Sequence, residues 1–214
     1  LKYSQTEDVD NIDDINHPLI KHAFQLSNTP KGVELSSSSD IPAGTGLGSS
    51  SSFTVGVLNA LYSQYGKNVS KENLARTACK IEIDRLNEPV GRQDQYASSF
   101  GGLNFIEFFK GNKVVVDKIN LTDTKLAELQ NNLFMFYTGS SRSANIILRE
   151  HSESFSIDKS FQMQQKMVDL AYIAKSKLLS GDFHDFGKLL NENWMLKRQL
   201  ASKISNTNID EIYD

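Results

Sequence analysis

The sequence is poor in cysteine and has no long apolar run. A single cysteine among 214 residues excludes an internal disulfide, and it is compatible with a reducing cytoplasm. No apolar run approaches the roughly 18 residues needed to span a bilayer, and no signal peptide is visible. The net charge of −3 argues against a general binder of nucleic acid or membrane surfaces. These absences predict a cytoplasmic globular protein with neither kind of partner.

The standard nucleotide-binding motifs are also missing, because no Gly-Lys-Ser/Thr and no GxGxxG is present. Instead, residues 36–65 read SSSSDIPAGTGLGSSSSFTVGVLNALYSQY, which predicts a strand, a glycine-rich turn and a helix. Glycine lets a ligand approach bare N–H groups, and a helix N-terminus attracts anions. Flanking apolar residues argue against a flexible linker. The stretch therefore predicts a phosphate cradle, made by Pro42, Gly44, Thr45, Gly46, Leu47, Gly48, Ser49, Ser50 and Ser51.

Two acidic residues downstream of the cradle are candidates for its chemistry. Helical spacing places Glu82 in the apolar arc that contains Ala75 and Ala78. A carboxylate there needs a cation, which is either Arg85 in an i,i+3 salt bridge or a Mg²⁺ ion facing the serines. Asp94 follows in an irregular polar loop, and the apolar residues after it predict that it lies near the interior. A phosphate cradle with two acids suits phosphoryl transfer, in which one acid serves the metal and the other the acceptor hydroxyl.

The remaining pattern predicts an α+β protein. We expect helices over about 18–26, 49–65, 70–86, 160–179 and 182–202. A hairpin is expected from strands over 104–109 and 114–119, and further strands over about 33–42 and 131–138. Arg142, at the mouth of a helix, is either a surface arginine or a clamp for a substrate anion.

The glycine-rich stretch resembles the second motif of the GHMP small-molecule kinases, Pro-x-x-x-Gly-Leu-Gly-Ser-Ser, which starts here at Pro42. In galactokinase-like members a glutamate precedes Pro-x-Gly-x-x-Asp-Gln, and Glu82 and the residues from Pro89 to Gln95 match that pattern. The resemblance implies ATP and Mg²⁺ as cofactors. It implies that Ser50, or its neighbour Ser49, holds the metal together with Glu82 and that Asp94 is the catalytic aspartate.

Three further stretches, GRQDQYASSFGGLNFIEF (91–108), YTGSSRSA (137–144) and GDFHDFGKLLNENW (181–194), resemble the D-glycero-D-manno-heptose 7-phosphate kinases within that family. This resemblance implies phosphorylation of the anomeric hydroxyl of the sugar phosphate, for surface glycan synthesis. The implied substrate-binding residues are Gly91, Gln93, Asp94 and Arg142. A fucokinase or galactokinase type of sugar kinase and a catalytically silent sensor are the alternatives, and a homodimer is compatible with the sequence.

The resemblance also implies two domains. We expect a nucleotide-binding domain over 1–120, like the ribosomal-protein-like α/β domain of the family, and a ferredoxin-like domain over 121–214. The family's first motif would precede Leu1 and its third would follow Asp214, so we expect the sequence to be truncated at both ends. An incomplete sheet would expose strand edges and apolar surface.

Overall fold

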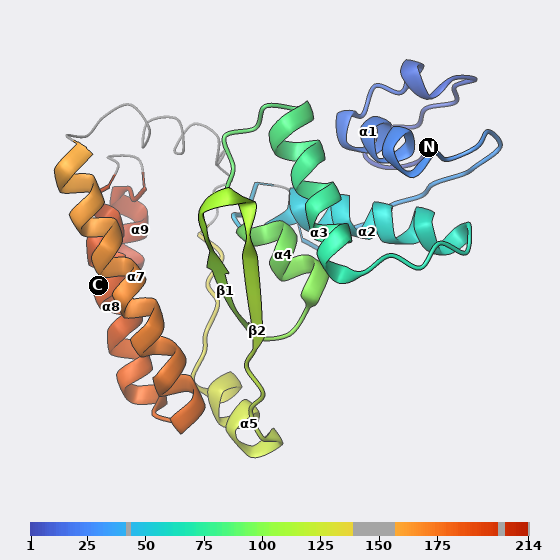
Figure 1. Ribbon diagram of the computed structural model, residues 1–214. Helices are drawn as coiled ribbons and strands as arrows, with labels where there is room; N and C mark the ends of the chain where they lie inside the picture. Colours follow the sequence, from blue (N-terminus) through green and yellow to red (C-terminus); the bar gives the residue numbers. More distant parts are fainter. Residues whose placement is uncertain (42–43, 139–156, 201–203, 214) are drawn as a thin grey trace. The chain divides into compact units, whose positions relative to one another are not determined.

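The structure is a computed structural model that describes residues 1–41, 44–138, 157–200 and 204–213. It divides into two compact units, Leu1–Gly102 and Leu103–Asp214 (Figure 1). The first unit contains the glycine-rich loop and both candidate acids. The expected boundary at residue 120 remains a prediction, because it concerns family domains, whereas the units are defined by packing within the chain.

The first unit is built from short helices. Their bounds are η1 Ile12–Asp14, α1 Pro18–Ser27, α2 Ser49–Gln64, α3 Lys71–Cys79, the π-helix η2 Lys80–Arg85, and α4 Gln93–Phe100. Local signals explain two of the starts. Pro18 occupies the first turn of α1, where no N–H is needed. The Ser70 hydroxyl accepts a hydrogen bond of 3.2 Å from the Asn73 amide and caps α3.

Helix α2 supplies much of the core of this unit. Its buried residues include Val55, Leu58 and Leu61, and they pack with Ile20 of α1 and Ile81 of η2. The opposite face of α2 is exposed along its length, at residues 52, 56, 59, 60, 63 and 64. Helix α2 is therefore buried on one face only, although apolar residues occur on most sides of its sequence.

The strand expected before the glycine-rich loop is not formed as a regular strand. Residues 33–39 carry no strand assignment, and their only β-bridge among the described residues joins Ser36 to Lys2. A regular strand needs a row of backbone hydrogen bonds to a neighbouring strand. Here the segment forms a single bridge to a described residue, from Ser36 to Lys2, so no regular strand forms.

In the second unit, strands β1 Asn104–Phe108 and β2 Val114–Lys118 form the expected antiparallel hairpin. Asn104 pairs with Lys118 and Phe108 with Val114, and η3 Lys110–Asn112 makes the turn with Gly111 at a φ of 72°. The helices of this unit are α5 Asp123–Asn131, α7 Ile157–Ser180, α8 Phe183–Arg198 and α9 Thr207–Tyr213. The sequence predicts α7 and α8, leaves a helix or a turn open where α5 lies, and gives no signal for α9.

Polar contacts attach α7 to the hairpin. The Tyr172 hydroxyl donates to Glu107 at 2.6 Å, and Lys175 pairs with Asp117 at 2.8 Å. At the turn into α8, Lys177 pairs with both Asp182 and Asp185. The second unit is thus held partly by ion pairs on its surface, which contribute little individually.

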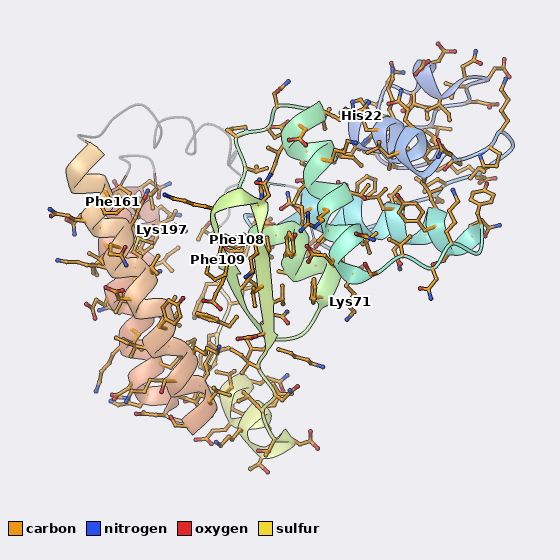
Figure 2. All side chains as sticks on the ribbon, in the orientation of Figure 1. His22, Lys71, Phe108, Phe109, Phe161 and Lys197 are labelled. Atoms are coloured by element: carbon orange, nitrogen blue, oxygen red, sulfur yellow. The ribbon has the colours of Figure 1, made fainter. Side chains whose placement is uncertain are left out.

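The predicted strand over 131–138 is not formed, because Asn131 ends α5 and residues 133–138 carry no strand assignment. Its side chains are largely in solvent, with Phe134 79% and Met135 78% exposed. Phe108, Phe109 and Phe161, labelled in Figure 2, are further exposed aromatic residues of this unit. The expectation of exposed apolar surface is therefore confirmed. Among the described residues, no helix is both long and apolar enough to cross a membrane.

Candidate active site at the head of helix α2

The glycine-rich loop ends at Gly48, which starts α2. Gly48 has a left-handed backbone with a φ of 67°, and its carbonyl accepts the first helical hydrogen bond, from the Ser52 amide at 2.9 Å. No side chain caps this helix end. The first-turn N–H groups, which have no intrahelical partners, therefore remain available to an anion.

The other residues of the predicted cradle surround this helix start. Gly44, Gly46 and Leu47 are exposed, whereas Thr45 and Ser49 are half-buried. Ser50 is exposed on the first turn of α2, and Ser51 is buried beside it. Pro42 lies outside the described residues. The loop thus presents backbone at the surface, as binding of a phosphate chain requires.

Glu82 lies in the core of the same unit, as its position in the apolar arc predicted. It is 2% exposed and belongs to the π-helix η2, a distortion that is frequent at functional sites. Its Oε2 accepts a hydrogen bond of 2.9 Å from the Ser51 hydroxyl and one of 3.0 Å from the Gln95 amide. Its Oε1 is buried without a hydrogen-bond partner.

Within the described residues, Glu82 has no cation partner, and no ion pair joins it to Arg85, which is exposed. Burial raises the pKa of Glu82, whereas the hydrogen bonds from Ser51 and Gln95 oppose the rise and the charge of Asp94 adds to it. The salt-bridge interpretation therefore finds no support. A buried carboxylate with one oxygen that accepts no hydrogen bond can coordinate a metal cation that binds together with a nucleotide.

Asp94 reaches the same helix start from the first turn of α4. A Cβ added to Gly48 would lie 3.2 Å from Cγ and 3.3 Å from Oδ2 of Asp94, so the carboxylate lies directly against the loop backbone. The residue is exposed, however, and the prediction of an interior position is wrong. The buried residues of this turn are its neighbours Gln95 and Tyr96, which face the core, whereas Asp94 faces the loop.

Helix α4 is fixed to α3 by three polar contacts. The Tyr96 hydroxyl donates to Glu72 of α3 at 2.9 Å, and the Ser99 hydroxyl donates to the Lys71 carbonyl at 2.6 Å. Lys71, labelled in Figure 2, donates in turn to the Phe100 carbonyl at 2.7 Å. Sequence reasoning missed this helix, because eight residues with no capping signal gave too little periodicity.

The remaining predicted site residues are less informative. Gly91 and Gln93 are exposed, just before and at the start of α4, and Arg142 lies outside the described residues. Gln95, in contrast, is the last residue of the Pro-x-Gly-x-x-Asp-Gln motif, and it is completely buried and donates to Glu82. Its position beside Asp94 was the sequence signal that could have identified it.

The arrangement fits a magnesium site completed by a nucleotide. The described residues contain no cluster of three or more His, Cys, Asp or Glu side chains that would enclose a metal. Mg²⁺ is commonly held by one or two carboxylates together with substrate phosphates and waters. Glu82, with its free Oε1 beside the serines at the head of α2, supplies a donor set of that kind.

Comparison with known proteins places this site in a class. Residues 17–102 match the family described as GHMP kinases N terminal domain, and this range contains the glycine-rich loop, Glu82 and Asp94. Residues 17–102 are therefore a GHMP kinase N-terminal domain.

Two relatives carry the resemblance further. The D-glycero-alpha-D-manno-heptose 7-phosphate kinase of Campylobacter jejuni is 30% identical over 188 residues, which are 88% of this chain and 56% of that protein. The crystal structure of a D-glycero-D-manno-heptose 1-phosphate kinase from Bacteriodes thetaiotaomicron superposes with a TM-score of 0.70 at 27% identity, covering 93% of this chain and 59% of that one.

A bifunctional fucokinase/GDP-fucose pyrophosphorylase of Arabidopsis thaliana is 24% identical over 187 residues, which are 86% of this chain and 18% of that protein. The chain thus spans 56% of the length of the heptose kinase relative and less of this one. The predictions of a GHMP kinase relationship and of an α+β family fold are confirmed.

Proposed function

We propose that the protein is an ATP-dependent sugar kinase that phosphorylates a heptose phosphate, with D-glycero-D-manno-heptose 7-phosphate as the substrate and its 1,7-bisphosphate as the product. One observation carries the proposal: Glu82 and Asp94 both meet the uncapped head of α2. Glu82 contacts it through Ser51 at 2.9 Å, and Asp94 lies against Gly48. The heptose kinase relatives support the choice of sugar.

In this proposal the first-turn amides of α2 and the loop backbone hold the triphosphate. Glu82, through Oε1, and a serine hydroxyl of α2 would hold Mg²⁺, with Ser49, Ser50 and Ser51 as the candidates. When bound, the ion neutralises charge on the transferring phosphoryl group. Ser50 is the residue that the family motif suggests, whereas Ser51 is the one that contacts Glu82 in the structure.

Asp94 would act on the acceptor. Its carboxylate accepts the proton of the sugar hydroxyl as the oxygen bonds to the γ-phosphorus, and the bond between that phosphorus and the β–γ bridging oxygen breaks to release ADP. A positioned base of this kind contributes about 10²–10⁴-fold to a rate. Gly91 and Gln93, exposed beside Asp94, are proposed contacts to the sugar, and Arg142 is a further one that the family resemblance implies.

The test is ADP release by the full-length protein with heptose 7-phosphate, fucose and galactose. Asp94→Asn should retain MgATP binding, measured by calorimetry, and lose at least about 10²-fold in kcat. Asp84→Asn is a matched control, because Asp84 is an exposed acid of η2 outside the site. Unchanged kcat in Asp94→Asn would remove the base assignment.

The fucokinase relative makes a fucokinase type the second candidate. A higher kcat/KM for fucose than for heptose 7-phosphate would establish it over the first. Nucleotide binding without ADP release from any sugar would instead indicate a silent sensor. The carboxylates of Glu82 and Asp94, both placed at the loop, argue against that alternative, because a sensor has no need of a base.

A further inference from the structure

Gln95 is a buried polar side chain to which the proposed chemistry gives no part. It has an exposed fraction of 0%, on the face of α4 that points into the core. Its Nε2 donates to Glu82 at 3.0 Å, and its own Oε1 has no hydrogen-bond partner. Leaving a buried polar atom unpaired costs about 1–3 kcal/mol, so an apolar side chain would serve better if packing were the only requirement.

The contact fixes one carboxylate oxygen and leaves the other free. Ser51 and Gln95 both donate to Oε2 of Glu82, at 2.9 Å and 3.0 Å, whereas Oε1 has no partner. Two donors on one oxygen, from different helices, define the plane of the carboxylate. The carboxylate therefore presents a single oxygen in one orientation, which is what a metal ligand requires.

The same contact joins the two acids of the site. Glu82 is on η2, while Gln95 follows Asp94 directly on α4. A displacement of α4 would move the Glu82 carboxylate through the Gln95 amide and would move Asp94 with it. We propose that Gln95 is a positioning residue that orients the free oxygen of Glu82 toward the metal and fixes the placement of that oxygen relative to Asp94. This inference rests on the proposed function.

The test replaces Gln95 by Met, which has a similar length and no donor, in the full-length protein. Ser99→Ala is the matched control, because Ser99 is also a buried polar residue of α4 but donates to the Lys71 carbonyl. Mn²⁺ serves as the probe, and its binding in the presence of a non-hydrolysable ATP analogue is measured by electron paramagnetic resonance. Binding of the analogue without metal is measured by calorimetry.

We expect Gln95→Met to weaken Mn²⁺ binding about 10- to 100-fold, as is usual when the hydrogen-bond partner of a metal ligand is lost. Metal-free binding of the analogue should stay within twofold of the wild type, and Ser99→Ala should leave Mn²⁺ binding unchanged. The Mg²⁺ concentration for half-maximal turnover should rise by the same factor. If Gln95→Met does not fold, Gln95→Asn, whose shorter amide cannot reach Glu82, should show the same loss.

Mn²⁺ affinity of the Gln95 variant within twofold of the wild type would overturn the positioning role. An equal loss of metal-free nucleotide binding would overturn it too, because the residue would then act on the fold of the whole site. If the wild type itself shows no nucleotide-dependent Mn²⁺ binding, the proposed function fails, and this inference fails with it. The wild-type measurement therefore separates the two failures.

Discussion

The contact between Gly48 and Asp94 makes Gly48→Ala the sharpest perturbation of this site. The new Cβ would lie 3.2 Å from Cγ of Asp94, whereas unstrained carbon contacts are about 3.5–4.0 Å. The carboxylate must therefore retreat by a few tenths of an ångström. Alanine at a φ of 67° adds about 1–2 kcal/mol of backbone strain.

A misplacement of about 1 Å in an active site can lower a rate by about 10²-fold. We therefore expect Gly48→Ala to reduce kcat by about 10- to 100-fold, which corresponds to about 1.4–2.7 kcal/mol of transition-state stabilisation. The assay is coupled ADP release at saturating MgATP and sugar phosphate. Urea unfolding of the same preparation measures the strain separately.

Gly66→Ala is the control for this strain. Gly66 follows the other end of α2 with a φ of 64°, and no atom lies within 4 Å of an added Cβ. This variant should lose a similar stability of about 1–2 kcal/mol and keep its kcat. If Gly48→Ala folds and retains kcat within twofold of the wild type, the placement of Asp94 against the loop does not govern turnover, and the reasoning is refuted.

Three further perturbations test the packing around the site. Burial raises the pKa of Glu82, so the ionised carboxylate destabilises the folded state once the pH exceeds the ordinary pKa of glutamate. Glu82→Gln should therefore unfold at a higher urea concentration than the metal-free wild type at pH 7. This difference in urea midpoint should shrink toward pH 4. Burial raises the pKa of Cys79 to about 11, so a disulfide reagent at pH 8 should modify the native thiol far more slowly than the urea-unfolded one. Tyr96→Phe removes the partly buried hydrogen bond to Glu72 and should lower the free energy of unfolding by about 1.5 kcal/mol, measured by urea titration.

Local chemistry in the sequence predicted much of the site. The glycine–serine alternation located the head of α2, and the apolar spacing around Glu82 predicted its burial. Those signals act within a turn or two of helix, where the backbone responds to its own side chains. The roles assigned to Asp94 and Arg142 stay predictions.

Other features depended on contacts that a one-dimensional pattern does not contain. The π-helix η2 interrupts a helical pattern that the sequence shows as continuous. Helix α4 is held by side chains from α2 and α3 that lie tens of residues away. The bond from Gln95 to Glu82 spans 13 residues and depends on that packing, so only the folded structure shows it.

The extended segment from Leu133 to Tyr137 has a practical consequence for anyone who handles the chain. Five successive large side chains, LFMFY, carry no charge and no proline and are 52–79% exposed. Such a window has the composition of segments that assemble into cross-β fibrils. Preparations of this chain should tend to precipitate as the protein concentration rises. Phe134→Lys places a charge inside the apolar segment and should raise the concentration at which precipitation begins.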